Sequence, residues 1–339
     1  MVLKSIKSLL AVAVFLVAAA TGWIVRELAR PIRIAADPAA GFFEVEKGLS
    51  ARAVLGHLES QGLVPAALPL RLACRIFYPG ERFKAGEYRF AEAVPAKAAL
   101  LVLFDGRVYL EPVTIPEGLT IKEAAEAVRP GDPAGAEAFR RAALDASLIA
   151  DLDPRARDLE GYLFPNTYDL PRKAPEADIV AAMVAGFHRV FHEDRRQRAA
   201  ELGLTVREAV TLASLIEEET ALPEERPLVS AVFHNRLKRG IKLDCDPTVA
   251  YALKLQGRYT GRLLLRDLKL ESPYNTYLHV GLPPGPISSP GTACLDAALH
   301  PAAVDDLYFV ARGDGSHRFS RTLSEHLEAV KKFRALKNH

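Results

Sequence analysis

An apolar stretch near the N-terminus constrains this chain more than any other feature. Residues 8–25 contain no charged side chain, Lys4 and Lys7 precede them, and Arg26 follows. A helix rises about 1.5 Å per residue, so this stretch would extend roughly 27 Å, close to the hydrocarbon thickness of a bilayer. The sequence therefore predicts a transmembrane anchor over residues 8–25, with residues 1–7 as a short N-terminal segment before it. The charges on the two sides do not fix its orientation, because Arg26, Arg30 and Arg33 follow the span.

A cleaved signal peptide is the alternative for the same stretch. Residues 18–20 are three alanines, which resemble the small residues of a cleavage site. The apolar run continues past them to Val25 and includes Trp23, a residue suited to the membrane–water interface. These features favour an uncleaved anchor, and a membrane is the first predicted partner.

Charge and cysteine usage exclude several classes of protein. The chain has 44 basic and 42 acidic residues, and Lys4 and Lys7 account for the excess, so the remainder has no net charge. Nucleic-acid binding is not expected of such a body. The three cysteines show no CxxC spacing, and the histidines show no helical ligand pair. The sequence therefore predicts no metal site and no cofactor.

The region after the anchor divides into a linker and two larger parts. Residues 26–41 have no periodicity and contain two prolines, which is typical of a linker. Residues 42–158 form a run of short α/β elements, with strands predicted at 42–46 and 110–115 and helices at 51–61 and 121–128. Residues 85–90 and 100–104 are expected to supply further short elements. Residues 159–339, where motifs become dense, are predicted to form a separate domain. The predicted fold class is α+β, and its length suits about two domains.

Two segments of the α/β region share one pattern. EKGLSARAV (46–54) and PEGLTIKEA (116–124) each place Gly-Leu and a Ser or Thr cap before an amphipathic helix. Each segment resembles LysM, a family that binds N-acetylglucosamine polymers. A generic βα turn with a capped helix is the alternative for both.

A helix with an unusual end follows in the second part. Thr205 and Glu208 form a predicted capping box, so the helix should begin at Val206 and end near Thr220, ahead of Pro223. Its last turn holds glutamates at positions 217, 218 and 219. Carboxylates at a helix C-terminus lie at the negative end of the helix dipole and repel one another, so stability alone does not favour them.

Helical spacing separates these three glutamates. Glu219 shares its face with Leu212, Leu215 and Ile216, whereas Glu218 shares the most polar face. Glu219 is therefore predicted to point inward, where burial and neighbouring carboxylates raise a carboxyl pKa and keep it protonated for general-acid chemistry. A solvated helix end is the alternative.

Three further segments carry polar and aromatic residues suited to a carbohydrate. KLDCDPTVAY (242–251) places Asp244 and Asp246 before a helix, with Asp246 as the predicted N-cap and Pro247 at the first helical position. The proline-rich segment 272–290 contains Asn275 and Tyr277 and is predicted to form a shaped binding surface. LEGYLFPNTY (159–168) supplies a second aromatic turn.

Taken together, these motifs resemble those of the YceG-like, or MltG, family. ASLIEEET, FHNRL, DPTVAY, YNTY, GLPPGPISSPG, LYFV and EGYLFPNTY occur in the order and spacing of that family. Its members are inner-membrane-anchored endolytic murein transglycosylases. The resemblance extends from the anchor to the C-terminus.

The resemblance implies a role for six residues. The family's catalytic glutamate directly precedes Thr, which corresponds to Glu219 here. Substrate-binding positions of the family correspond to Glu160, Asn166, Asp246, Asn275 and Tyr277. Many relatives have Asp where this chain has Asn166, so a charged role is not carried over.

The implied reaction is lytic. Glu219 would protonate the glycosidic oxygen between N-acetylmuramic acid and N-acetylglucosamine, and then take the proton of the muramyl C6 hydroxyl as it closes on C1. The resemblance also implies a periplasmic catalytic domain that acts on nascent glycan strands, ends their elongation and meets peptidoglycan synthases. Asp244 or Asp246 could instead serve a hydrolytic muramidase, which needs a second carboxylate. A non-enzymatic LysM-type scaffold is a further alternative.

Overall fold

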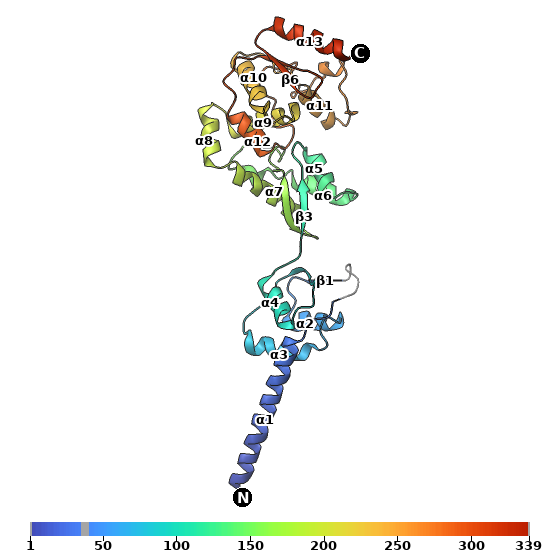
Figure 1. The fold of residues 1–339 in the computed structure, drawn as a ribbon, viewed down its shortest axis with the longest axis vertical. Coiled ribbons are helices and arrows are strands. Elements are labelled where there is room, and N and C mark those ends of the chain that lie inside the picture. The colour runs from blue at the N-terminus through green and yellow to red at the C-terminus, as the bar shows by residue number, and fades with distance from the viewer. Residues whose placement is uncertain (1, 35–40, 338–339) are drawn as a thin grey trace. The chain divides into compact units, whose positions relative to one another are not determined.

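The computed structural model describes residues 2–34 and 41–337 and has the predicted mixed helix and strand content (Figure 1). The three sheets of the described residues have two strands each. The chain divides into two compact units, Met1–Glu111 with Asp169–Lys173 and Pro112–Tyr168 with Ala174–His339. This architecture confirms the α+β class.

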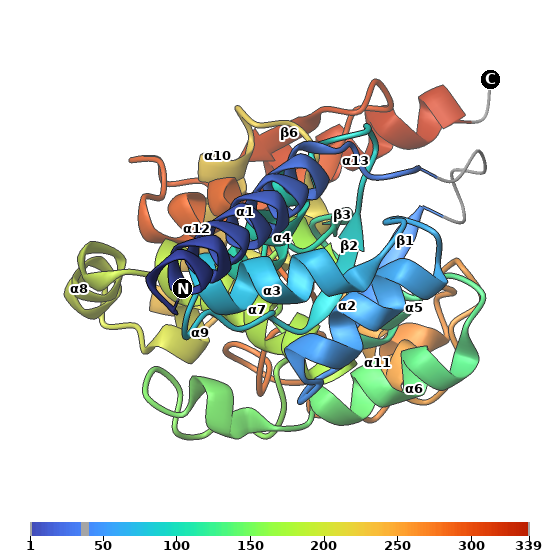
Figure 2. The same ribbon diagram turned by 90° about the horizontal axis from the view of Figure 1, so that it is seen from below.

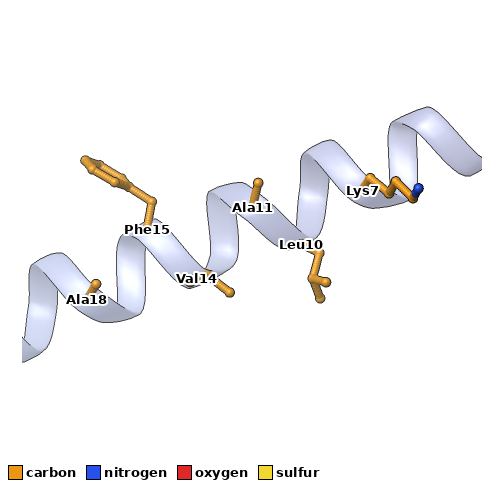
Figure 3. A pocket seen from close by; sticks show the side chains of 6 residues that line it. All are labelled: Lys7, Leu10, Ala11, Val14, Phe15 and Ala18. Atoms are coloured by element: carbon orange, nitrogen blue, oxygen red, sulfur yellow. The ribbon is translucent and has the colours of Figure 1, made fainter.

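Helix α1 (Val2–Ala29) contains the predicted anchor. Its segment Ile6–Ala29 is long and apolar enough to cross a membrane by length and composition, and is compatible with a single-pass anchor. Figure 3 shows Leu10 and Val14 projecting from one side of the helix and Phe15 from another. An apolar surface on all sides suits lipid better than water.

The C-terminal end of α1 is part of the first unit's core. Ile24 and Leu28 are buried there together with Ile32, whose backbone N–H donates to the Val94 carbonyl at 2.9 Å. The predicted linker 26–41 therefore differs from the structure at its start, because the helix continues to Ala29 and the following residues pack on the unit. Positions 35–40 of that linker lie outside the described residues.

The rest of the first unit consists of short elements around one apolar core. They are β1 (Phe42–Val45), α2 (Ala51–Ser60), α3 (Ala67–Phe77), β2 (Gly86–Arg89) and α4 (Ala96–Asp105). β1 and β2 pair antiparallel, with Phe43 opposite Tyr88, and α2 and α3 pack against each other (Figure 2). Ser50 caps α2, which confirms the predicted helix start.

The second predicted βα copy has the expected elements. β3 (Leu110–Ile115) is followed by α5 (Ile121–Val128), which begins with the capping box of Thr120 and Glu123. β3 pairs with β4 (Asn166–Pro171), and each strand runs from one compact unit into the other. α5 packs on α6 (Pro133–Ala142), and both helices belong to the second unit. The compact units therefore divide after Glu111, whereas the predicted domain boundary is near residue 158.

The second unit is built around α9 (Val206–Glu219). Its other principal elements are α7 (Glu176–Val190), α8 (Glu193–Glu201), α10 (Arg226–Lys238), α11 (Asp246–Leu255), α12 (Thr292–Leu299), β5 (Tyr308–Ala311), β6 (His317–Ser320) and α13 (Leu323–Lys337), with 3-10 turns at Ala146–Ile149 and Asp267–Lys269. α9 contacts α8, α10, α11 and α12 (Figure 1). Its capping box and its bounds match the prediction.

Candidate active site

The three glutamates that end α9 have three different surroundings. Glu217 accepts a hydrogen bond from the backbone N–H of Gly291 at 2.8 Å, which places its carboxylate at the N-terminus of α12. Glu218 is exposed. Glu219 is partly buried and lines a cleft of about 560 Å³. The like charges are thus directed apart, and the helix-face prediction for Glu219 agrees with its partial burial.

The environment of Glu219 favours its protonated form. Burial raises the pKa of Glu219 to about 7, and the neighbouring Asp246 adds to the rise, while the Cys245 thiol opposes it by hydrogen bonding. Burial also holds the pKa of Cys245 well above its usual value, so this thiol keeps its proton. A carboxyl that is about half protonated at neutral pH can both donate and accept a proton.

The cleft is formed entirely by the second unit. It lies between the end of α9, α10, the turn before α11, the β5–β6 hairpin and α13. Its lining residues are Glu219, Val232, Arg236, Leu243, Asp244, Asp246, Tyr277, Leu307, Tyr308, Phe309, Val310, Ala311, His317, Leu323, His326 and Leu327. A mixture of aromatic rings, carboxylates and a guanidinium suits a ligand with both apolar faces and hydroxyl groups.

Two predicted residues meet directly in this cleft. The Tyr277 hydroxyl donates to Asp246 Oδ1 at 2.6 Å. Asp246 is the first residue of α11 and Cys245 is the N-cap, so the predicted cap at Asp246 is wrong by one position. Its carboxylate is bonded to Tyr277 instead of the helix N-terminus.

The turn before α11 is fixed by a buried arginine. Arg236 donates from Nε to the Leu307 carbonyl at 2.7 Å and from Nη1 to Asp244 Oδ2 at 3.0 Å, and Nη1 also donates to the carbonyls of Lys242 and Leu243. Asp244 has a positive φ of 51°, a conformation that Asp tolerates better than most residues. The ion pair and the carbonyl bonds hold this turn in place.

Thr276 joins the DPT turn to the YNTY loop. Its hydroxyl accepts from the Cys245 N–H at 3.0 Å and lies 3.0 Å from the Thr248 hydroxyl. Lys242 Nζ donates to the Tyr277 carbonyl at 2.9 Å. Two segments about thirty residues apart in the sequence therefore form one rigid wall beside Glu219.

Asn275 and Glu160 lie in the interior. Asn275 is completely buried, and its amide donates to the carbonyls of Leu268 and Leu270 while its oxygen accepts from the Tyr277 N–H. Glu160 is 7% exposed and accepts from the Ile121 N–H at 3.1 Å and the Tyr251 hydroxyl at 3.1 Å. Burial raises the pKa of Glu160 to about 8, and the charge of Asp158 adds to it. Both residues hold local structure, and their substrate-binding role stays a prediction.

Asn166 lies away from these groups in the structure. It is exposed at the start of β4, and its side-chain oxygen accepts from the Thr167 N–H at 2.8 Å. It is not among the residues that line the cleft. Its predicted contact with substrate also stays a prediction.

Much of the proline-rich segment is interior, which differs from the predicted binding surface. Residues 285–291 are buried, and the Ile287 N–H donates to the Ser214 hydroxyl of α9 at 3.1 Å. A Cβ at Gly161 would lie 2.4 Å from Pro286, so this close approach requires glycine. The segment braces α9, and from it Tyr277 reaches the cleft.

Sequence reasoning did not single out most of the cleft residues, among them Arg236, Tyr308, Phe309 and His317. Arg236 lies in the FHNRL motif, and Tyr308 and Phe309 lie in LYFV, so motif order alone contained the signal for three of them. His317 had no such marker. Within residues 2–34 and 41–337, no group of three or more His, Cys, Asp or Glu residues could hold a metal ion.

An α+β domain whose central helix delivers a carboxyl of raised pKa into an open cleft can perform acid–base chemistry. The sequence model of the YceG-like family matches residues 43–332. The match covers most of the chain, and the protein belongs to the YceG-like family.

Relatives support this membership. A Bacillus subtilis (strain 168) protein named endolytic murein transglycosylase is 34% identical over 274 residues, which is 76% of this chain and 74% of that protein. A Streptococcus pneumoniae R6 protein of the same name is 30% identical over 303 residues, and the match covers 79% of this chain and 53% of that protein. The chain thus spans about half the length of the pneumococcal relative.

A solved structure is also similar. The crystal structure of a yceG-like protein from Listeria monocytogenes has a TM-score of 0.57 and 29% sequence identity to this chain. The match covers 85% of this chain and 97% of the Listeria chain.

Proposed function

We propose that this protein is an endolytic murein transglycosylase with Glu219 as its catalytic acid and base. The observation that carries the proposal is the position of Glu219, a carboxyl whose pKa is raised to about 7 by burial, in an open cleft. The names of the Bacillus and pneumococcal relatives support the substrate class. The substrate is the β-1,4 bond between N-acetylmuramic acid and N-acetylglucosamine in peptidoglycan glycan strands.

The reaction needs one carboxyl that acts twice. Protonated Glu219 gives its proton to the glycosidic oxygen as the bond to the muramyl C1 breaks. The resulting carboxylate takes the proton of the muramyl C6 hydroxyl while the oxygen of that hydroxyl bonds to C1. This step yields a 1,6-anhydro end and restores the protonated acid. An intramolecular nucleophile gains from a wall that is already rigid, and Thr276 and Arg236 supply such rigidity around the cleft.

Other cleft residues bind the sugars in this proposal. Asp246 and Tyr277, joined by their 2.6 Å hydrogen bond, present oxygen atoms to sugar hydroxyls. Tyr308 and Phe309 line the cleft as aromatic surfaces. Glu160 and Asn275 support the loops from behind, and Asn166 belongs to the outer part of the glycan path.

The N-terminal region locates the enzyme. Helix α1 anchors the chain in the inner membrane, with residues 1–7 cytoplasmic and the catalytic domain, proposed as residues 159–339, on the periplasmic side. The α/β region 42–158, with its two βα copies, is a LysM-like glycan-binding region. In this position the enzyme cleaves nascent strands beside peptidoglycan synthases and ends their elongation.

Mass analysis of the products from purified sacculi tests the proposal. Wild-type protein is expected to release fragments with 1,6-anhydromuramyl ends, and E219Q is expected to release none above background. Reducing ends would indicate a hydrolytic muramidase. Glycan binding without new chain ends would indicate a non-enzymatic scaffold. Either of these results would overturn the lytic reaction.

A further inference from the structure

A carboxylate–histidine pair lines the same cleft and takes no part in the chemistry described above. Glu225, which directly precedes α10, is 6% exposed. Its Oε1 accepts from the backbone N–H of His317 at 2.7 Å, and its Oε2 lies 2.6 Å from Nδ1 of the same residue. His317 is the first residue of β6 and a lining residue of the cleft.

The protonation of this pair follows from its hydrogen bonds. Burial would raise the pKa of Glu225, but hydrogen bonds from His317 and Thr220 outweigh it and lower the pKa below its usual range. Glu225 is therefore ionised at neutral pH and only accepts hydrogen bonds. The proton between them therefore belongs to His317 Nδ1, and Nε2 is the ring nitrogen that can face a ligand.

Packing holds the imidazole in one orientation. Its ring lies edge-on to Phe309 with centroids 5.5 Å apart, and it also contacts Phe319 at 6.5 Å. Nε2 has no hydrogen-bond partner among the described residues, and it is not one of their buried polar atoms without a partner. With the side chain 14% exposed at the cleft, Nε2 is the accessible ring nitrogen.

The pair is also connected to the proposed catalytic residue. Thr220, which follows Glu219 directly, donates from Oγ1 to Glu225 Oε2 at 3.2 Å. This bond ties the end of α9 to the carboxylate that orients His317. Thr220 thus links the end of α9, which carries Glu219, to the carboxylate that orients His317.

We propose that His317 is a substrate-binding residue whose Nε2 forms a hydrogen bond with a sugar hydroxyl in the cleft, with Glu225 as its positioning residue. The proposal rests on the proposed function, because the ligand is the same glycan strand. Here one nitrogen is clamped by an ionised carboxylate, and the other is left accessible beside the proposed acid.

This contact is tested by measuring the kinetics of purified full-length protein in detergent. H317A is expected to lower kcat/KM for release of anhydro ends roughly 10- to 100-fold, and added imidazole is expected to restore part of the loss. E225Q replaces the ionised acceptor at Nδ1 by an amide, so the ring loses the partner that orients it, and a loss is expected with the ring still present. H300A, at the exposed C-cap of α12 outside the cleft, is the matched histidine control.

Two results of these kinetics would overturn the proposal. One is an H317A variant with wild-type kcat/KM. Another is a loss in H317A that imidazole does not restore, accompanied by wild-type kinetics of E225Q, which would indicate a packing role. If H317A does not fold, H317Q replaces it, with thermal unfolding of each variant as the check.

Failure of the proposed function would be visible separately, because wild-type protein would then release no 1,6-anhydro ends. In that case the contact is measured by binding of soluble peptidoglycan fragments to E219Q and to E219Q/H317A. A weaker affinity of the double variant supports the contact between His317 and the glycan. Equal dissociation constants for the two variants would overturn it.

Discussion

Two regions of the second unit each contain a buried carboxyl with a raised pKa, and they differ in what surrounds it. Glu160 lies in a closed interior cluster, where the Ile121 N–H and the Tyr251 hydroxyl both donate to it. Glu219 lies at an open cleft beside Asp246 and the Cys245 thiol. A raised pKa therefore does not distinguish a structural carboxyl from a reactive one, whereas access to a ligand does.

The sharpest way to break this comparison is to neutralise the cleft carboxyl. E219Q removes the transferable proton and is expected to lower the rate of bond cleavage about 10³-fold or more. Release of anhydro ends measures this loss. E218Q, one residue earlier on the exposed side of the same helix, is the matched control and should remain close to wild type.

The same variant has an expected effect on stability. The pKa of Glu219 is raised in the folded state, so the folded protein binds this proton more tightly than the unfolded chain does. Its contribution to the free energy of unfolding therefore falls as pH increases from about 4.5 to 7. E219Q removes that fall and should be about 1 kcal/mol more stable than wild type at pH 8. Lower stability of E219Q in denaturant titrations would contradict the role of burial.

Activity should depend on pH through the cleft carboxyl. General-acid catalysis needs protonated Glu219, so kcat is expected to fall above pH of about 7, roughly tenfold per unit. Initial rates between pH 6 and 9 measure this limb. The midpoint of this limb should be unchanged in E160Q, because Glu160 does not line the cleft. A rate that stays constant to pH 9 would contradict the assignment of Glu219 as the acid.

Substitution of Glu160, in the closed interior cluster, should change the free energy of unfolding. E160A leaves the Ile121 N–H and the Tyr251 hydroxyl without their acceptor and is expected to lower the free energy of unfolding by about 2 kcal/mol. E160Q keeps an acceptor of the same shape and should cost less. Denaturant titration at pH 7 compares the three proteins. An E160A variant as stable as wild type would show that the cluster does not hold α5.

The smallest expected effect belongs to the wall of the cleft. Y277F removes the hydrogen bond to Asp246 Oδ1 and is expected to lower kcat/KM roughly 3- to 10-fold. Tyr277 is partly exposed, so the free energy of unfolding should change by less than about 1 kcal/mol. A large loss of stability with unchanged kinetics would place Tyr277 with Glu160 among the framework residues.

Local signals in the sequence predicted many elements correctly. The capping boxes at Thr120 and Thr205 and the serine cap at Ser50 each act over a few residues, so the predicted helix starts agree with the structure. Residues 100–104 were expected to form a short separate element and instead belong to helix α4. The cap of α11 was misplaced by one residue, because Tyr277, 31 positions away, bonds to the Asp246 carboxylate.

The candidate site was predictable in part. Helical periodicity placed Glu219 on an inward face of α9, and motif order pointed to Asp246 and Tyr277. Motif order did not separate residues that face the cleft from residues behind it. Asn275, for example, belongs to the same motif as Tyr277 but is completely buried. Loop residues lack a fixed period, so their side-chain directions depend on which distant carbonyls and hydroxyls they meet.

By itself, the sequence determined the apolar N-terminal helix, the start and end of α9 and the presence of a glutamate on its inward face, because these depend on residue type and short-range spacing. Tertiary structure decided that Glu217 caps α12, that Glu219 opens into a cleft and that Glu225 orients His317 from 92 positions away. Hydrogen bonds between segments so far apart in the chain exist only once the core has packed, which is why no local pattern contains them.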